Sequence, residues 1–195
     1  ILVVTGGNPA GEFLRLLGDG REFSLRWLTY AYQAQAGGIA EALALARPFV
    51  RDEPFMVVLG DNLVERSVRA GADAFRKQGT GARIFLKEVP DPEKFGVAEV
   101  AGNRVVRIVE KPKAPKSNLA VAGIYMYDPS VFGVIAGLER SARGELEITD
   151  VNNVYIARGA MSYEVLQGWW IDAGGSHEDL RRANELVART GANRD

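Results

Sequence analysis

Two aspartates follow short apolar runs of the kind that forms buried strands. Asp61 comes after Phe55–Gly60, and Asp172 comes after Trp169-Trp170-Ile171 and before the Gly174-Gly175 turn. In an open α/β sheet, ligands bind beyond the carboxyl ends of the strands. Two carboxylates at such ends could share one divalent cation, since Mg²⁺ takes one or two carboxylates and completes its shell with water and substrate phosphate. The alternative is that each aspartate caps a neighbouring turn.

Basic residues that suit a phosphate occur in two further places. Lys111 ends the strand-like run Val109-Glu110-Lys111, where its ammonium is a compact point charge for a phosphate. Glu110 points the other way and could accept hydrogen bonds from hydroxyls. Arg143 lies between two helical stretches, and its guanidinium suits bidentate phosphate recognition. The alternatives are a solvated surface pair at 110–111 and an ordinary loop arginine at 143.

The loop Gln33–Gly38 precedes a helix, and its two glycines permit close approach of a ligand to the backbone. As a phosphate motif it is weak, because it matches neither G-x-G-x-x-G nor the P-loop. The one histidine, His177, falls in the first turn of the last helix and is expected to be a solvated or capping residue. Serine–histidine and histidine–metal chemistry therefore have little support. The three tryptophans are expected in the core or in a pocket wall.

The elements that must position these residues alternate along the chain. Apolar strands are predicted at 1–4, 26–33, 55–59, 82–87, 119–127 and 163–166, and helices at 12–17, 39–47, 68–77, 130–138, 148–157 and from Ser176. A turn is predicted at 6–9 and a hairpin at 96–109. Strands that are apolar without alternation predict burial on both faces, hence an α/β sandwich with a mixed, mainly parallel sheet. We expect one domain over residues 1–195.

Composition excludes several classes of function. The chain of 195 residues carries 24 Lys+Arg against 25 Asp+Glu, so it has no basic excess for binding nucleic acid. It has no cysteine, which removes thiolate chemistry and suits a cytoplasmic location. It also has no apolar run of the roughly 20 residues that span a bilayer, so no membrane partner is expected. The strand-like start at Ile1 suggests that an N-terminal segment precedes it.

Six segments occur in one order that resembles sugar-1-phosphate nucleotidyltransferases. They are Val58–Asn62, Phe95–Glu99, Val109–Pro112, Pro115–Tyr125, Ser141–Asp150 and Gly168–Gly174. The run Gly144–Asp150 is similar to the glucose-1-phosphate thymidylyltransferase branch. The resemblance implies a Rossmann-like, three-layer nucleotidyltransferase fold. It also implies transfer of dTMP from dTTP to glucose 1-phosphate, with release of dTDP-glucose and pyrophosphate and with Mg²⁺. Relatives of this kind are commonly homotetramers and serve nucleotide-sugar biosynthesis, including the dTDP-rhamnose pathway.

The resemblance also implies roles for individual residues. Asp61 and Asp172 match metal-binding aspartates, and Lys111 and Arg143 match residues that hold the sugar phosphate. Asp61, Lys111 and Arg143 are therefore the expected catalytic residues. The remaining expected substrate contacts are Glu110, Gly96, Val121 and Tyr125 at the sugar, Gln33 at the thymine edge, and Gly38 beside the nucleoside.

One family feature is not in the sequence. The glycine-rich G-x-G-T-R signature and its following lysine, which cradle the triphosphate, would stand before Ile1, so turnover is expected to require a segment that precedes Ile1. A uridylyltransferase or another sugar nucleotidyltransferase remains an alternative, because a glutamine does not separate thymine from uracil cleanly. A non-catalytic module that binds nucleotide sugars is the third possibility.

Overall fold

The structure is a computed structural model that describes residues 1–7 and 10–195. Asn8 and Pro9, which belong to the predicted turn at 6–9, lie outside the described residues. By their internal contacts the residues form two compact units: unit 1 comprises Ile1–Glu53 and Val131–Val151, and unit 2 comprises Pro54–Ser130 and Asn152–Asp195. The expectation that residues 1–195 form one nucleotidyltransferase-like domain stays a prediction. No helix in the described ranges is both long and apolar enough to cross a bilayer.

Unit 1 contains one pair of short parallel strands and several short helices. Its elements are β1 (Leu2–Gly6), α1 (Ala10–Leu17), η1 (Arg21–Phe23), β2 (Thr29–Gln33), α2 (Ile39–Ala44), α3 (Arg47–Val50), α5 (Val131–Ala136) and the start of α6 (Ile148–Ala157). The register sets Gly6 opposite Gln33. This pairing places Gln33 at the carboxyl end of β2, directly before the loop that leads into α2.

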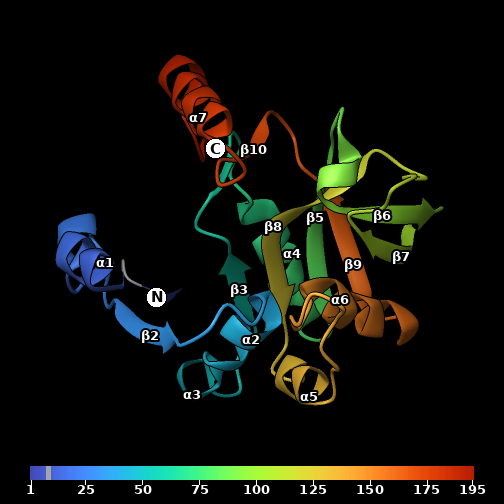
Figure 1. The fold of residues 1–195 in the computed structure, drawn as a ribbon, viewed down its shortest axis with the longest axis horizontal. Coiled ribbons are helices and arrows are strands. Elements are labelled where there is room, and N and C mark those ends of the chain that lie inside the picture. The colour runs from blue at the N-terminus through green and yellow to red at the C-terminus, as the bar shows by residue number, and fades with distance from the viewer. Residues whose placement is uncertain (8–9) are drawn as a thin grey trace. The chain divides into compact units, whose positions relative to one another are not determined.

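Unit 2 contains a mixed sheet around one long buried strand (Figure 1). Its strands are β3 (Phe55–Val58), β4 (Asn62–Val64), β5 (Ala82–Glu88), β6 (Gly96–Ala101), β7 (Arg104–Glu110), β8 (Leu119–Tyr127), β9 (Met161–Val165) and β10 (Trp170–Asp172). The sheet order is β7-β6-β8-β5-β9, and β3 also pairs with β8. The short strands β4 and β10 form a separate antiparallel pair. The helical elements are α4 (Arg69–Gln78), η2 (Pro92–Lys94), the end of α6, and α7 (His177–Thr190).

Helices cover both faces of this sheet. Phe75 of α4 packs with Phe85 of β5 and with Ile124 and Met126 of β8 in one buried cluster. Successive side chains of a strand point to opposite faces, so Tyr125 and Tyr127 lie on the other face of β8. There the Tyr127 hydroxyl donates to Asn152 Oδ1 of α6 at 2.6 Å. The helix–sheet–helix layering confirms the α/β class within unit 2.

The mixed character of the sheet is confirmed, but its expected mainly parallel order is wrong. Among the described strands only β1–β2 and β5–β9 are parallel, whereas β8 runs antiparallel to β3, β5 and β6. The hairpin β6–β7 and the pair β4–β10 are antiparallel as well. An apolar run without alternation indicates burial on both faces, and it carries no information on the direction of the neighbouring strand.

Most predicted elements are present with shifts of a few residues. The limits of β8 and α6 are as predicted, and Ser176 caps α7 through its hydroxyl, which accepts the Asp179 N–H at 3.1 Å. His177 is exposed in the first turn, as expected. The prediction for the tryptophans is wrong for Trp27, whose side chain is 69% exposed, because it lies in an irregular stretch before β2.

Asp128, directly after β8, is expected to contribute to stability in a pH-dependent way. Its carboxylate accepts hydrogen bonds from the Gly81 N–H (2.5 Å), from Ser130 and from the Tyr155 hydroxyl. Burial raises the pKa of this carboxyl, but the hydrogen bonds outweigh burial and lower it overall. A depressed pKa in the folded state contributes stability above the unfolded value and loses it as the pH falls through the folded value.

Asp128→Asn should therefore lower the free energy of unfolding at pH 7 by about 1–2 kcal/mol, since hydrogen bonds to a partly exposed charge are weakened by solvent. The difference from wild type should shrink below about pH 4, where the carboxyl protonates. Urea denaturation of both proteins at the two pH values measures this. Asp73→Asn, which removes an exposed ion pair with Arg76, is the matched control. Equal stability of wild type and Asp128→Asn at pH 7 would contradict the expectation.

Candidate functional site

The candidate site lies where two strands diverge along one edge of β8. β3 pairs with residues 124–127 of β8, whereas β6 pairs with it only at Ala120. Between these two pairings, no strand of the described residues lies beside Gly123 on this edge of β8. The segment that follows β3 instead makes the hydrogen bonds to the Gly123 N–H and carbonyl. The Gly123 carbonyl accepts the Leu59 N–H at 2.8 Å, and the Gly123 N–H donates to Asn62 Oδ1 at 2.8 Å. The chain that leaves β3 is therefore held over this gap, and Asp61 lies within it.

The two aspartates predicted to share a cation are brought together by a short ladder. β10 pairs with β4 so that Asp172 stands opposite Asn62, and the Ala173 N–H donates to the Asp61 carbonyl at 2.8 Å. Asp61 Oδ1 accepts from the Asn62 amide at 2.9 Å, whereas Asp61 Oδ2 lies over Gly174. A Cβ at Gly174 would stand 2.3 Å from that oxygen, so only glycine leaves room for the carboxylate.

The charge of Asp61 bears on the protonation of Asp172. Burial raises the pKa of Asp172, and the charge of Asp61 raises it further, against a lowering by the Gly174 N–H and by Lys111. Asp172 Oδ1 accepts the Gly174 N–H at 3.0 Å, so the turn-capping alternative is realised for one oxygen. Asp172 is half-buried and Asp61 is exposed. Two neighbouring carboxylates of like charge supply the hard oxygen donors that suit a divalent cation. In the described ranges, no cluster of three or more acidic, histidine or cysteine side chains is arranged to hold a metal ion, so a cation held by these two carboxylates would take its other ligands from water or phosphate.

Three more of the predicted residues converge on the same place. Tyr125 is buried on β8, and burial together with the charges of Glu110, Asp172 and Asp61 raises the pKa of its hydroxyl. Glu110 ends β7 and stands opposite Gly96 in the β6–β7 register. Val121 lies on the same face of β8 as Tyr125, because the two are four residues apart on a strand. The structure thus groups carboxylates and a hydroxyl around the Asp61–Asp172 pair.

Lys111, which lies near Asp172, has a strained backbone conformation. Its φ is +42°, a left-handed conformation that is uncommon for a residue with a side chain, and its N–H donates to the Phe95 carbonyl at 3.0 Å. Strained residues of this kind concentrate at functional sites. The Phe95 ring meets the Trp170 ring at 5.2 Å between centroids and 62° between planes. Lys111 is therefore tied to the strand that ends at Asp172.

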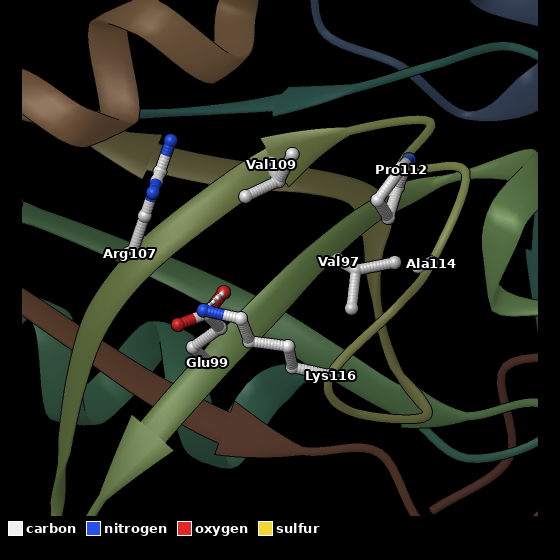
Figure 2. A pocket seen from close by; sticks show the side chains of 7 residues that line it. All are labelled: Val97, Glu99, Arg107, Val109, Pro112, Ala114 and Lys116. Atoms are coloured by element: carbon white, nitrogen blue, oxygen red, sulfur yellow. Dashed lines mark ion pairs between the residues drawn. The ribbon is translucent and has the colours of Figure 1, made fainter.

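The loop after Lys111 folds back over the opposite face of the β6–β7 hairpin (Figure 2). There it encloses a pocket of about 210 Å³, and Lys116 lies 3.8 Å from the Glu99 carboxylate. The pocket is lined by Val97, Glu99, Arg107, Val109, Pro112, Ala114 and Lys116. Neighbouring residues of a strand face opposite sides, so Glu110 points away from the pocket that Val109 lines. This pocket is separate from the carboxylate group.

The remaining predicted residues belong to unit 1 and form a group of their own. Gln33 Nε2 donates to the Gly38 carbonyl at 3.2 Å and to Glu41 Oε2 at 3.1 Å, and Glu41 is held by Arg140 at 2.5 Å. Hydrogen bonds from Arg140 and Gln33 lower the pKa of Glu41. Gly38 has φ +98°, and a Cβ there would stand 2.4 Å from the Leu146 carbonyl oxygen. Both donor hydrogens of Gln33 are used, so its amide presents an acceptor.

Arg143 stands in the turn that follows α5. Its guanidinium binds Glu147 through Nε at 3.1 Å and Nη2 at 2.8 Å, and Nη2 lies 3.4 Å from Glu145. The turn is joined to the Gln33–Gly38 loop, because the Leu146 N–H donates to the Gly37 carbonyl at 2.8 Å. A phosphate at Arg143 would therefore compete with Glu147 for the guanidinium.

Sequence reasoning missed Asn62, Gly123, Gly174 and Glu41 as parts of these groups. Asn62, Gly123 and Gly174 lie within the quoted segments Val58–Asn62, Pro115–Tyr125 and Gly168–Gly174, so a signal exists for all three of them. The sequence pattern does not identify the contact partner of each residue, because that partner lies far away along the chain.

The comparisons with known proteins place the chain in a family. It belongs to the nucleotidyl transferase family, whose model matches residues 1–190. A glucose-1-phosphate thymidylyltransferase of Actinoplanes sp. is 42% identical over 190 residues, covering 96% of this chain and 62% of that protein. A low-salt glycan biosynthesis nucleotidyltransferase of Haloferax volcanii is 41% identical over 188 residues, with 95% and 52% covered. The chain thus spans between about half and two thirds of these relatives.

Solved structures confirm the fold class. A candidate glucose-1-phosphate thymidylyltransferase from Bacillus anthracis, solved with sucrose, is similar with a TM-score of 0.91 and 46% identity, covering 97% of this chain and 76% of that one. UDP-glucose pyrophosphorylase in complex with UDP-glucose shares the fold, with a TM-score of 0.80 at 23% identity and 96% and 80% covered. The nucleotidyltransferase fold expected from the six segments is therefore confirmed.

Proposed function

We propose that the protein is a nucleotidyltransferase that transfers dTMP from dTTP to glucose 1-phosphate, giving dTDP-glucose and pyrophosphate with Mg²⁺. The observation that supports it most is the convergence of Asp61, Asp172 and Glu110 near the Tyr125 hydroxyl, with Lys111 near Asp172. The similarity to glucose-1-phosphate thymidylyltransferases supports the choice of reaction.

This reaction needs no nucleophile from the protein, because an oxygen of the sugar phosphate attacks the α-phosphorus in line. Catalysis is then positioning and neutralisation of charge. Asp61 and Asp172 would hold the cation, which when bound supplies positive charge to the phosphate oxygens. The Lys111 ammonium offsets repulsion between the two phosphate-bearing substrates, and Arg143 binds the sugar phosphate after exchanging its contact with Glu147. Glu110, with Gly96, Val121 and Tyr125, contacts the sugar.

Gln33 would read the base through its carbonyl oxygen. The amide orientation follows from chemistry, since Nε2 meets a carbonyl and a carboxylate, and a flipped amide would set oxygen against oxygen. Oε1 then accepts the N3–H of thymine, with Gly38 beside the nucleoside. Uracil carries the same N3–H, and this favours UTP-glucose-1-phosphate uridylyltransfer as the second candidate function.

Release of pyrophosphate by the complete gene product tests the proposal, with glucose 1-phosphate, Mg²⁺ and each of dTTP, UTP, dCTP and dATP. We expect kcat/KM to be highest with dTTP and at least about tenfold lower with dCTP, because one mismatched hydrogen-bond pair costs 1–3 kcal/mol. A preference for UTP would establish the second function. No release with any nucleotide would contradict both and favour a module that only binds nucleotide sugars.

A further inference from the structure

Asn62 makes three side-chain hydrogen bonds, and each goes to a part of the candidate site. Its Oδ1 accepts the Gly123 N–H and the Trp170 indole N–H, both at 2.8 Å. Its Nδ2 donates to Asp61 Oδ1 at 2.9 Å. The amide therefore connects β8, β10 and one carboxylate of the proposed cation pair.

These partners leave the Asn62 amide one orientation. Gly123 N and Trp170 Nε1 can only donate, so the atom that faces them must be the oxygen. The nitrogen then necessarily faces Asp61, where it can only donate. The amide also packs directly against Gly123, where a Cβ would stand 2.7 Å from Asn62 Cγ, so only glycine leaves room for it. The two donors, Gly123 N–H and Trp170 Nε1–H, thus determine that the Asn62 NH2 group, and not its oxygen, faces Asp61.

The two oxygens of the Asp61 carboxylate consequently have different surroundings. Oδ1 is engaged by Asn62, and Oδ2 lies over Gly174, two residues after Asp172. Asp61 itself is exposed and would otherwise sample several rotamers. Groups that hold a metal ligand by a hydrogen bond commonly change metal affinity 10- to 100-fold when they are removed.

We propose that Asn62 is a positioning residue that fixes the Asp61 carboxylate so that Oδ2 is presented toward Asp172 for a divalent cation. The inference rests on the proposed function, in which Asp61 and Asp172 hold that cation. Gly123 and Trp170 serve as the anchors of the amide. Phe95, whose carbonyl accepts the Lys111 N–H, packs against Trp170 and supports the same anchor.

The test measures Mn²⁺ binding by electron paramagnetic resonance on the complete gene product without substrates, for wild type, Asn62→Ala and Trp170→Phe. Asn62→Ala removes the donor to Asp61, whereas Trp170→Phe removes one anchor and keeps the ring beside Phe95. The matched control is Asn153→Ala, because the Asn153 amide also makes structural hydrogen bonds, to the Ile108 N–H at 3.0 Å and to its carbonyl at 2.9 Å. Thermal unfolding of every variant accompanies the titrations.

Asn62→Ala should weaken Mn²⁺ binding about 10- to 100-fold and Trp170→Phe about 2- to 10-fold, while Asn153→Ala keeps the wild-type affinity at a similar loss of stability. In turnover, Asn62→Ala should lower kcat while the KM for glucose 1-phosphate stays within about threefold. If wild type binds Mn²⁺ and Asn62→Ala binds it equally well, the positioning role is wrong. If Asn62→Ala fails to fold, unchanged affinity in Trp170→Phe overturns it instead. Absence of Mn²⁺ binding by wild type would count against the proposed cation pair itself, and hence against the inference that rests on it.

Discussion

Asp172→Asn should lower kcat about 10³-fold and leave the fold intact. The substitution keeps the size of the side chain, and Oδ1 can still accept the Gly174 N–H. It removes one of the two charges that would hold the cation, and the loss of one such electrostatic contribution costs roughly 10²–10³ in rate or more. The pKa of Asp172 is raised by burial and by Asp61, so the carboxylate is unfavourable for folding, and the variant should be at least as stable as wild type.

Steady-state pyrophosphate release and thermal unfolding together measure this prediction. Asp179→Asn is the matched control, because Asp179 lies in the first turn of α7, the helix that follows β10, and its charge also raises the pKa of Asp172. The control should keep kcat within about threefold. A kcat for Asp172→Asn near that of wild type would refute the cation role of this residue.

Lys111→Gly should lower kcat/KM for glucose 1-phosphate about 10- to 100-fold without a loss of stability. A hydrogen bond from a charged donor to phosphate is worth about 1.5–3 kcal/mol, which corresponds to that range. The left-handed backbone of Lys111 costs about 1 kcal/mol, and glycine relieves it at a similar cost in unfolded-chain entropy. Activity and stability should therefore respond differently to the same substitution.

Lys113→Gly is the control for this second prediction, since it removes the same charge two residues further along the same loop. It should leave kcat/KM within about threefold. Initial rates over a range of glucose 1-phosphate concentrations give the ratio, and urea denaturation gives the stability. Equal losses of activity in the two variants would show that the effect is one of net charge and does not belong to Lys111.

The sequence predicted the elements that are long and apolar. β8 has the predicted limits because its long apolar run lies between Ser117-Asn118 and Asp128-Pro129, and α6 ends just before Gly159. β4 and β10 were not separated as paired strands, since three residues cannot specify a strand by themselves and these two are stabilised by each other across more than a hundred residues. The predicted direction of the strands around β8 is wrong for a related reason, because the burial of a strand does not determine whether its neighbour runs parallel or antiparallel to it.

In the candidate site as well, residues with recognisable local chemistry are predictable from the sequence, whereas residues that depend on distant partners are not. Asp61, Asp172, Lys111 and Glu110 could be named because carboxylates and a lysine at strand ends have recognisable chemistry, and the structure groups them in unit 2. Asn62 escaped notice because its importance depends on Gly123 and Trp170, which no local pattern connects to it. The roles of the residues grouped in unit 2, like those of Gln33, Gly38 and Arg143 in unit 1, stay predictions.

The most direct measurement is a crystal structure of the complete gene product grown with Mn²⁺ and dTDP-glucose, with anomalous diffraction recorded at the manganese edge. We predict one strong anomalous peak within about 2.0–2.4 Å of a carboxylate oxygen of Asp61 and of one of Asp172, with phosphate oxygens completing the shell. Manganese bound away from both side chains, or side chains that diverge with the nucleotide sugar in place, would contradict the idea that these two aspartates form one cation site.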